Sequence, residues 1–516
     1  MHRFAKPSLI ITCFAPAAPE WGGASPHAYL RRLWDACRLL GMTAPIDGLP
    51  TDERLRLDGR AATVAAYTVL AGARTRTDGP GVHAALLFAE HDVVGLVALL
   101  APNDPDAGPE QWNTLLNQWS AAVARAGATD PPPEQILGEF HVFTALYREG
   151  RSRSERSMAQ VVRQHAPASG DGEQSWWRGH DVTEHGFSVW RTGRGDPAQV
   201  VGDFCVLAPA RAEEALDEWA WAVSGEYGMR PLTRYLMHAA KAGFEARVYQ
   251  RANRRSLHER LAASDRESEA LLRALQPSAS GDPVSLKDVL AAAAQLDRTR
   301  LGPQGTLWSL TKHRDLARTV GLAVTNMRRF TPPSRRVGAG TSWPERDVAA
   351  AEALIAEIQD DVEYMSTARE RAESARAAAT AVTDRALNEY RNRLSLVQTS
   401  TLGSLLTALT VVQTLDYDLP LPKPAQLPAI LVLAAVALLL PLAVLRQAAV
   451  SAVSLSYRWI DSAAAGLLGS SVCWLALTVW RLRLGHTLLP PVVTLCACAA
   501  VGLAVTAAVH RAARRR

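Results

Sequence analysis

Two stretches near the C-terminal end of the chain are apolar along their whole length. They are Ala429 to Leu445 and Val492 to Val509, and neither contains a charged residue. A helix that is apolar on every face belongs in a membrane or deep inside a large core, whereas a soluble surface helix carries polar residues on its outer face. The last quarter of the chain therefore predicts helices that cross a membrane.

We predict a transmembrane domain over residues 394–516 with about four helices, because a bilayer core takes about 20 helical residues to cross. The first predicted span has serines and threonines at near-helical spacing, which favours close helix packing and leaves open a polar lining for an aqueous path. No span contains an acidic or basic residue, so a channel would need an oligomer or a wide pore. The predicted spans are Leu394–Leu415, Leu427–Leu445, Ala463–Trp480 and Leu488–Val509.

Arginines flanking these spans indicate an orientation, since cytoplasmic flanks are enriched in Lys and Arg. Arg391 and Arg393 precede the first span, and Arg511 to Arg516 follows the last. We therefore predict a multi-pass protein of the cell (plasma) membrane, with its N-terminal region and its C-terminus in the cytoplasm. Arg481 and Arg483 would lie outside and depart from this pattern.

The remaining composition excludes two function classes. The net charge is +5 over 516 residues, and basic residues fall in separate clusters rather than one stripe, so no nucleic-acid partner is expected. The six cysteines include no Cys-x-x-Cys pair. They indicate neither a disulfide framework nor a zinc site, and no cofactor or metal is predicted.

Residues 1–150 predict an α+β domain with a ferredoxin-like, split βαββαβ order. Residues 61–73 fit no strand in this order and are interpreted as an additional helix. The N-terminal apolar run is short and ends at Pro16, so it predicts a strand rather than a signal peptide. The predicted elements are strands Ser8–Ala15, Val82–Ala89, Val93–Ala101 and Ile136–Tyr147, with helices Ser25–Leu40 and Pro109–Arg125.

Residues 151–230 predict a second, smaller α+β unit. Its expected elements are strands Phe187–Arg191 and Gln199–Leu207 and a helix Ala212–Val223. A weak internal repeat links the two units, because Phe14-Ala15-Pro16, Leu100-Ala101-Pro102 and Leu207-Ala208-Pro209 each end an apolar run. Polar residues Ser152 to Gln174 predict a flexible loop between the units.

Residues 231–393 predict a long helical, partly coiled stalk. Its segments are Pro231–Leu275, Ser285–Phe330 and Glu345–Arg393, separated by proline-containing linkers that include Thr331 to Pro344. The last segment is rich in alanine, glutamate and arginine and leads directly into the first predicted span. A helix that enters the bilayer without a break can transmit a rotation or a load.

Histidines and cysteines are the residue types here that could bind a metal or act as a nucleophile. His165, His180 and His185 could supply metal ligands, but His180 and His185 fall in a predicted loop without helical ligand spacing, so a solvated loop is the favoured interpretation. Cys37 and Cys205 lie in a predicted helix and an apolar strand, which favours buried packing over nucleophilic catalysis.

Phosphate-binding and acid–base motifs are equally weak. Gly193-Arg194-Gly195 lacks the further glycine of a dinucleotide loop, and the chain has no Gly-Lys-Ser/Thr sequence. The carboxylate pairs Glu213-Glu214 and Asp360-Asp361 are neighbours on predicted helices, where adjacent side chains do not face each other. We therefore predict no catalytic residue and no enzyme, although the histidine region keeps an unrecognised enzyme open.

Segments at both ends of the chain resemble a known family. Leu9 to Pro16, Leu33 to Arg38 and Gly41 to Gly48 are similar to the actinobacterial CATRA proteins, named for association with caspase-like and TPR-repeat proteins in conflict systems. The run Asn392 to Thr399 into the first predicted span is also similar. The resemblance implies a caspase-like protease and a TPR-repeat protein as partners and implies no catalytic residue.

Together these features give two hypotheses. The first is a membrane-anchored component of a prokaryotic conflict or antiviral defence system, in which a cytosolic sensing or partner-binding module is coupled to helices that contact membrane lipid. A homo-oligomer is possible under this hypothesis. The alternative is a CorA-like or other ion channel or transporter. The Gly-Met-Asn loop expected of the CorA family is replaced by Asp416-Tyr417-Asp418-Leu419-Pro420, which weakens the alternative.

Overall fold

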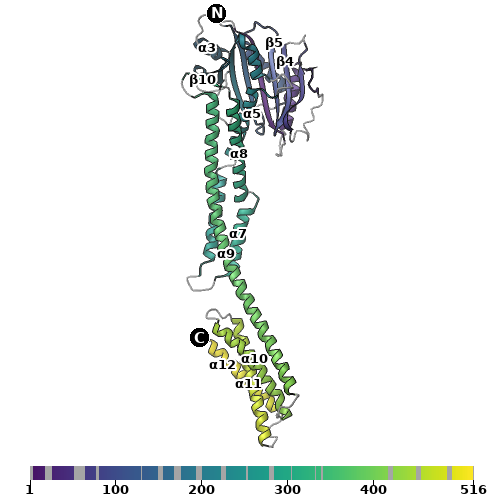
Figure 1. Ribbon diagram of the computed structural model, residues 1–516, viewed down its shortest axis with the longest axis vertical. Helices are drawn as coiled ribbons and strands as arrows, with labels where there is room; N and C mark the ends of the chain where they lie inside the picture. Colours follow the sequence, from purple (N-terminus) through teal and green to yellow (C-terminus); the bar gives the residue numbers. More distant parts are fainter. Residues whose placement is uncertain are drawn as a thin grey trace. The chain divides into compact units, whose positions relative to one another are not determined.

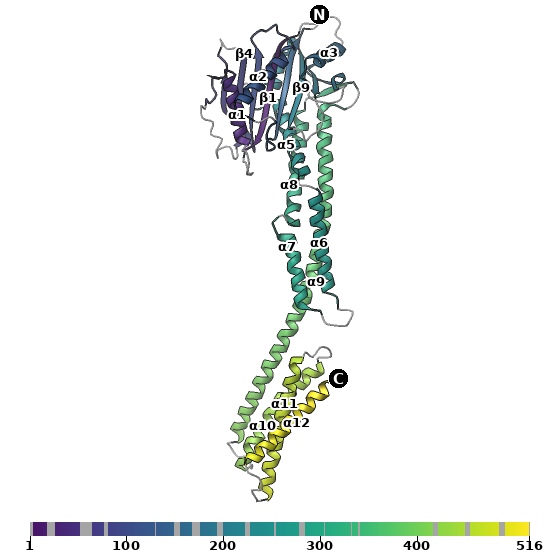
Figure 2. The same ribbon diagram turned by 180° about the vertical axis from the view of Figure 1, so that it is seen from behind.

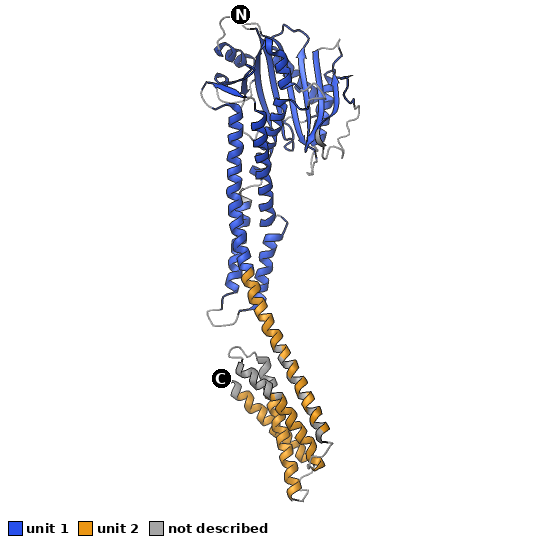
Figure 3. Ribbon diagram, viewed as in Figure 1, with its two compact units in different colours: residues 1–376 blue, residues 377–516 orange. Residues whose placement is uncertain are grey.

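The computed structural model divides the chain into two compact units, residues 1–376 and 377–516 (Figure 3). The residues that the structure describes are 4–17, 26–51, 64–76, 81–128, 131–148, 155–167, 176–192, 200–221, 228–251, 254–277, 284–303, 305–331, 333–338, 341–415, 422–448, 455–484 and 491–514.

A mixed sheet of ten strands dominates the first unit (Figure 1). Its strand order is β10-β7-β8-β9-β6-β1-β5-β4-β3-β2. The β6–β9 pair is parallel and the other neighbouring pairs are antiparallel. The strands are β1 (Phe4–Pro16), β2 (Ala44–Pro45), β3 (Val64–Arg74), β4 (Gly81–His91), β5 (Val93–Pro102), β6 (Gly138–Tyr147), β7 (His180–Thr183), β8 (Ser188–Thr192), β9 (Val201–Pro209) and β10 (Ser334–Val337).

The sheet is buried on both faces, which explains why its central strands are apolar almost without alternation. Along β1, Leu9, Ile11 and Cys13 belong to one core cluster, whereas Ile10 and Phe14 belong to the other. Helices α1 (Pro26–Leu39) and α2 (Gln111–Arg125) cover the first face (Figure 2). The second face packs against helices from the later part of the chain.

These later helices are long, as the 231–393 segment predicts. Side chains of α5 (Pro231–Arg251), α8 (Thr306–Phe330) and α9 (Trp343–Leu415) contribute to the core on the second face, including Tyr235, Val324 and Trp343. Gly302 and Gly305 separate two of the helices. The other described helices of the first unit are α3 (Glu155–His165), α4 (Glu213–Ala220), α6 (Arg254–Ala274) and α7 (Leu286–Leu301), with the short 3₁₀ turns Trp176–Arg178 and Ala210–Ala212. Helix α9 starts in the first unit and continues past residue 376 into the second.

Most predicted elements of the N-terminal region are present, and two predictions are wrong. The additional helix expected at residues 61–73 is strand β3 where it is described, and this strand pairs with β4. The loop expected over Ser152 to Gln174 contains helix α3, which buries Met158, Ala159 and Val162 against the sheet. This helix has 11 residues, and most of them are polar, so the sequence resembles a loop. Its few apolar residues lie on one side of the helix and pack against the core.

The linker Thr331 to Pro344 also contains regular structure. Strand β10 lies inside it and pairs with β7 at one edge of the sheet. The strands of the two predicted α+β units share one sheet, because β6 pairs directly with β9. The boundaries predicted at residues 150, 230 and 393 stay predictions.

Among its described residues, the second unit contains three helices after α9: α10 (Lys423–Ala448), α11 (Leu455–Leu484) and α12 (Pro491–Arg514). Within the described residues, two segments are long and apolar enough to cross a membrane by length and composition, Ser462–Arg483 and Val492–Arg511. They overlap the third and fourth predicted spans. A shorter apolar segment, Lys423–Ala437, lies in α10, and the first two predicted spans stay predictions.

Small residues bring α11 and α12 close together. A Cβ atom added to Gly466 would lie 2.1 Å from Oγ1 of Thr506 and 2.9 Å from the backbone oxygen of Gly502. Such contacts leave no room for a side chain, and close approach through glycine is a common way for helices to associate in lipid.

Candidate functional site

The first turn of α9 is fixed by its own sequence. The hydroxyl of Ser342 accepts a hydrogen bond from the backbone N–H of Glu345 (3.4 Å), and the Glu345 carboxylate accepts one from the N–H of Ser342 (3.0 Å). This reciprocal pair is a capping box, and Pro344 suits the first turn of a helix. The hydrogen bonds from Ser342 lower the pKa of Glu345. The helix start is therefore specified locally.

Two carboxylates then attach this helix start to the sheet. Asp347 on α9 forms an ion pair with Arg191 on β8 and accepts a hydrogen bond from the Tyr235 hydroxyl of α5 at 2.9 Å. Asp181 on β7 accepts the backbone N–H of Trp343 at 2.9 Å and the Arg336 guanidinium of β10 at 3.4 Å. We call these residues, Arg191, Tyr235, Asp347, Asp181 and Arg336, the α9 anchor.

The anchor is largely removed from solvent. The Asp181 side chain is fully buried, and those of Arg191 and Asp347 are 14% and 16% exposed. Burial raises the pKa of Asp181 despite the Trp343 N–H and Arg336. Burial alone would lower the pKa of Arg191, but Asp347 outweighs it, so this pKa is raised. A buried pair of this kind is costly to break, because the remaining charge loses its partner.

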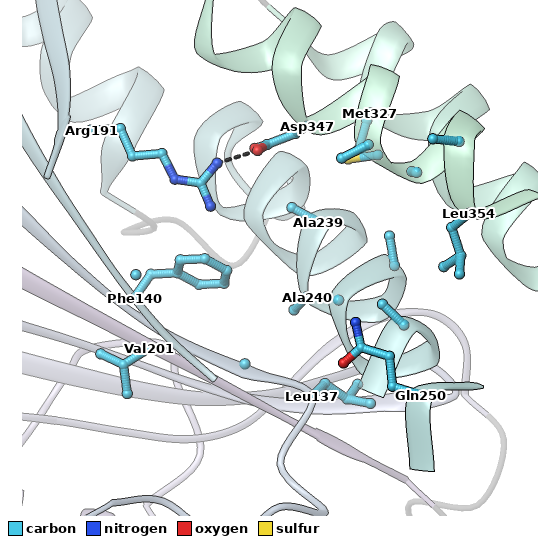
Figure 4. Close-up of a pocket in the computed structure, with 18 of the residues that line it drawn as sticks. Leu137, Phe140, Arg191, Val201, Ala239, Ala240, Gln250, Met327, Asp347 and Leu354 are labelled. Carbon is cyan, nitrogen blue, oxygen red and sulfur yellow. Dashed lines mark hydrogen bonds and ion pairs between the residues drawn. The ribbon is translucent and has the colours of Figure 1, made fainter. Parts of the chain in front are cut away.

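A cavity of about 220 Å³ lies beside the anchor, between the sheet, α5 and α9 (Figure 4). Alanine and glycine face it from both helices, for example Ala239, Gly243 and Ala350, and these small side chains leave the space open. Arg191 and Asp347 lie on one side and Gln250 on the opposite side (Figure 4). Phe140, Val201, Leu137, Met327 and Leu354 supply apolar wall.

The chemistry of this cavity suits binding more than catalysis. Its polar groups are Arg191 and Asp347, which pair with each other, together with Gln250 and Glu357. A nucleophile beside a base, the usual sign of covalent catalysis, is not among these lining groups. An enclosed, mainly apolar pocket with a few placed polar groups is typical of small-molecule sites.

The histidines predicted as possible metal ligands are not brought together. His180 lies buried in β7 and stacks on Trp190 with 4.5 Å between ring centroids, whereas His185 is about half exposed and lies beside Phe187. His165 ends α3. The solvated-loop prediction is wrong for His180, because β7 is an inner strand of the sheet. Among the described residues, no group of three or more His, Cys, Asp or Glu side chains could hold a metal.

The remaining candidates have mostly structural positions. Cys37 and Cys205 are buried in the core, as predicted, and burial raises both thiol pKa values. Glu213 forms an ion pair with Lys6. Asp361 is buried and accepts the Tyr249 hydroxyl at 2.6 Å, so the helix-surface prediction is wrong there. The segment Gly193-Arg194-Gly195 lies outside the described residues.

One polar cluster was missed by sequence reasoning. His141 on β6 lies between two carboxylates, with Nδ1 3.0 Å from Asp203 and Nε2 3.3 Å from Glu139, and Tyr29 donates to Glu139 at 2.9 Å. Glu139 and His141 are two apart on a strand and so share a face, which was the available signal. Their partners come from α1 and β9, and sequence spacing does not reveal them.

These features define an α+β protein built on a large mixed sheet, with a helix anchored to that sheet and apolar helices after it. Two family models match the chain in sequence. The CASPASE and TPR Repeat-Associated N-terminal domain matches residues 8–224, and the corresponding C-terminal domain matches residues 230–372. The chain belongs to this family, CATRA, which confirms the resemblance seen in the sequence. No curated protein and no solved structure matches it.

Proposed function

We propose that this chain is a membrane-anchored, non-enzymatic component of a conflict or defence system. The observation that carries the proposal is the order of its parts: CATRA-N and CATRA-C domains over residues 8–372, followed by two helices long and apolar enough to cross a bilayer. The family name associates these domains with caspases and TPR repeats. The proposed partners are therefore a caspase-like protease and a TPR-repeat protein.

The N-terminal region is proposed as the partner-binding module. Strands β6, β1, β5 and β4 are neighbours in that order and pair antiparallel, with α1 following β1 and α2 following β5. This arrangement supports a ferredoxin-like unit as the centre of the module. Additional strands on both sides would extend it into a broad binding platform.

Helix α9 is the proposed coupling element. It begins at the α9 anchor and continues to Leu415, where the first predicted span ends. A partner that loosened the anchor would free the start of this helix. The multi-pass arrangement, with four spans and both the N-terminal region and the C-terminus cytoplasmic, belongs to the same proposal.

Membrane fractionation and a membrane-potential dye test the anchoring together. The full chain and a truncation ending at Arg393 would be expressed inducibly in a bacterial host. We expect only the full chain to enter the membrane fraction and to resist extraction by high salt. Recovery of the full chain in the soluble fraction would overturn the anchoring.

The dye separates an anchor from a pore. Membrane localisation with an intact potential, in the absence of partners, supports an anchor that awaits a trigger. Collapse of the potential by the full chain favours the channel or transporter alternative, which ion flux in liposomes would then measure.

Partner binding is tested by co-purification. The full chain would be expressed together with a candidate caspase-like protease and a candidate TPR-repeat protein, and purified from solubilised membranes. Retention of either partner, but not of an unrelated TPR-repeat protein, supports the proposal. Cleavage of this chain by the protease, at residues 152–174 or 331–344, is a further proposed step. If both segments stayed intact after the defence system was triggered, that step would be contradicted.

A further inference from the structure

The cavity beside the α9 anchor is a built space rather than a packing defect at one residue. Its walls come from four parts of the fold that are far apart in sequence: the sheet around Phe140, helix α5, Met327 of helix α8, and helix α9. Both helices present alanine or glycine at successive turns toward it. Protein interiors normally fill such space with larger side chains. A space lined by several small residues therefore indicates that a ligand binds there.

The size of the cavity limits that occupant. A volume of about 220 Å³ equals roughly seven water molecules at their liquid volume. This is smaller than the pockets that hold drug-sized ligands. The space suits a small ligand of one or two rings, and the opening near the exposed residues Gln250 and Ala353 gives a route of entry.

The polar groups indicate the chemistry of the ligand. Asp347 uses both carboxylate oxygens, one on Arg191 and one on Tyr235. The second terminal nitrogen of Arg191 points away from Asp347 and toward the side of the cavity where Phe140 lies (Figure 4). It presents N–H donors to a ligand acceptor there. Gln250 and Glu357 line the cavity as well, and an amide oxygen and a carboxylate accept from ligand N–H groups.

Charge and polarity exclude the two simplest alternatives. An anionic ligand would meet Asp347, which already neutralises Arg191, and also Glu357. A pure hydrocarbon would bury the Arg191 donors without a partner, which is costly. A ligand with an aromatic ring can instead lie against the Phe140 ring, accept a hydrogen bond from Arg191 at one end and donate one to Gln250 or Glu357 at the other.

We propose that this cavity binds a small uncharged planar heterocycle carrying a carbonyl acceptor and an N–H donor, of the nucleobase type. The carbonyl accepts from Arg191, the ring packs against Phe140, and the N–H donates to Gln250 or Glu357. Because Arg191 also pairs with Asp347, ligand binding would change the strength of the Arg191–Asp347 ion pair in the α9 anchor. This inference stands on the cavity and does not depend on membrane anchoring.

Calorimetric titration of the purified full chain tests the proposal with four probes. Hypoxanthine and uracil carry the required carbonyl and N–H groups, indole has a similar ring without the carbonyl, and benzoate is an anion. We expect hypoxanthine or uracil to bind at least about tenfold more tightly than indole and benzoate, as one to two hydrogen bonds to charged or amide groups provide.

Two variants and one control variant locate the binding. Ala353→Leu fills the exposed opening and should weaken binding by about tenfold or more, whereas Ala356→Leu, an exposed alanine on the same helix that does not line the cavity, should leave it unchanged. Gln250→Ala should weaken binding by about tenfold. Thermal midpoints of all three variants check that they fold.

Three outcomes overturn the inference. The first is that neither hypoxanthine nor uracil binds at roughly millimolar concentration. The second is that Ala353→Leu binds as tightly as the unmodified chain, which would place the ligand elsewhere. The third is that indole or benzoate binds best, which would make the cavity a site for apolar or anionic ligands.

Discussion

At the scale of single residues, His141 is held by carboxylate partners at both of its ring nitrogens. Burial disfavours its charged form, but hydrogen bonds to Asp203 and Glu139 outweigh burial and raise the pKa of His141 to about 10. Two carboxylates thus hold one imidazolium inside the sheet region, with Tyr29 completing the set. Because these contacts hold a charge inside the fold, we interpret the cluster as stabilising the folded state.

A pH dependence follows from this pKa. The ordinary value is 6.5, so the folded state holds a proton that the unfolded state releases between pH 6.5 and about 10. Stability from His141 is therefore fully present below pH 6.5 and is lost as the pH rises toward 10. We expect the free energy of unfolding to fall by about 2 kcal/mol or more over this range.

Denaturant unfolding at a series of pH values measures this loss. In His141→Gln the proton is absent, so the slope between pH 7 and 9.5 should flatten while stability near pH 6.5 drops. His185→Gln is the matched control, since His185 is about half exposed and lies outside the cluster. Equal slopes in the unmodified chain and His141→Gln would contradict the assignment.

At the scale of elements, the start of α9 depends on partners distant in sequence. Asp347→Asn removes the charge that pairs with Arg191 and should cost roughly 3–5 kcal/mol, because a buried cation is left uncompensated. Tyr235→Phe removes one hydrogen bond to a carboxylate and should cost about 1.5–3 kcal/mol. Unfolding of the full chain, followed by circular dichroism, gives both values.

The exposed Asp360 on the same helix supplies the comparison for this test. Asp360→Asn should change stability by less than about 0.5 kcal/mol, as surface substitutions do. If Asp347→Asn proved as mild as Asp360→Asn, the α9 anchor would not hold the helix.

A second element-scale prediction concerns α11 and α12. Gly466→Ala places a methyl group against Thr506 and the Gly502 backbone and should force the helices apart at a cost of about 1–3 kcal/mol. Gly403→Ala on α9, where no atom lies within 4 Å of the added carbon, is the control. Thermal unfolding of the detergent-solubilised chain compares them, and equal midpoints would argue against the close helix contact.

Elements with strong local patterns were predictable from sequence, and those decided by distant contacts were not. The apolar runs of β1, β4 and β5 and the capping box of α9 are local signals. Residues 61–73 combine alanines that favour a helix with Thr68 and Val69 that favour a strand, and pairing with β4 decides the outcome. The α9 anchor joins Asp181 to Arg336 and Arg191 to Asp347, and no sequence spacing predicts such pairs.

At the scale of the whole molecule, the ten-stranded sheet joins the two α+β units predicted from sequence. Strand β6 pairs with β1 on one side and with β9 on the other. Helix α5 covers the second face of the sheet, and its Arg247 donates to the backbone oxygens of Ile136 and Leu137 at 2.6 and 3.0 Å. Residues 1–150 alone would therefore expose a long apolar edge and an uncovered face.

We expect a fragment of residues 1–150 to aggregate or remain unfolded, and a fragment of residues 1–376 to unfold cooperatively. The longer fragment restores β9 on the edge of β6 and the helices that cover Phe140 and Val142. Size-exclusion chromatography and denaturant unfolding of the two fragments compare them directly. A monomeric, cooperatively folded 1–150 fragment would establish the predicted boundary at residue 150 and show that the first α+β unit needs neither β9 nor the later helices.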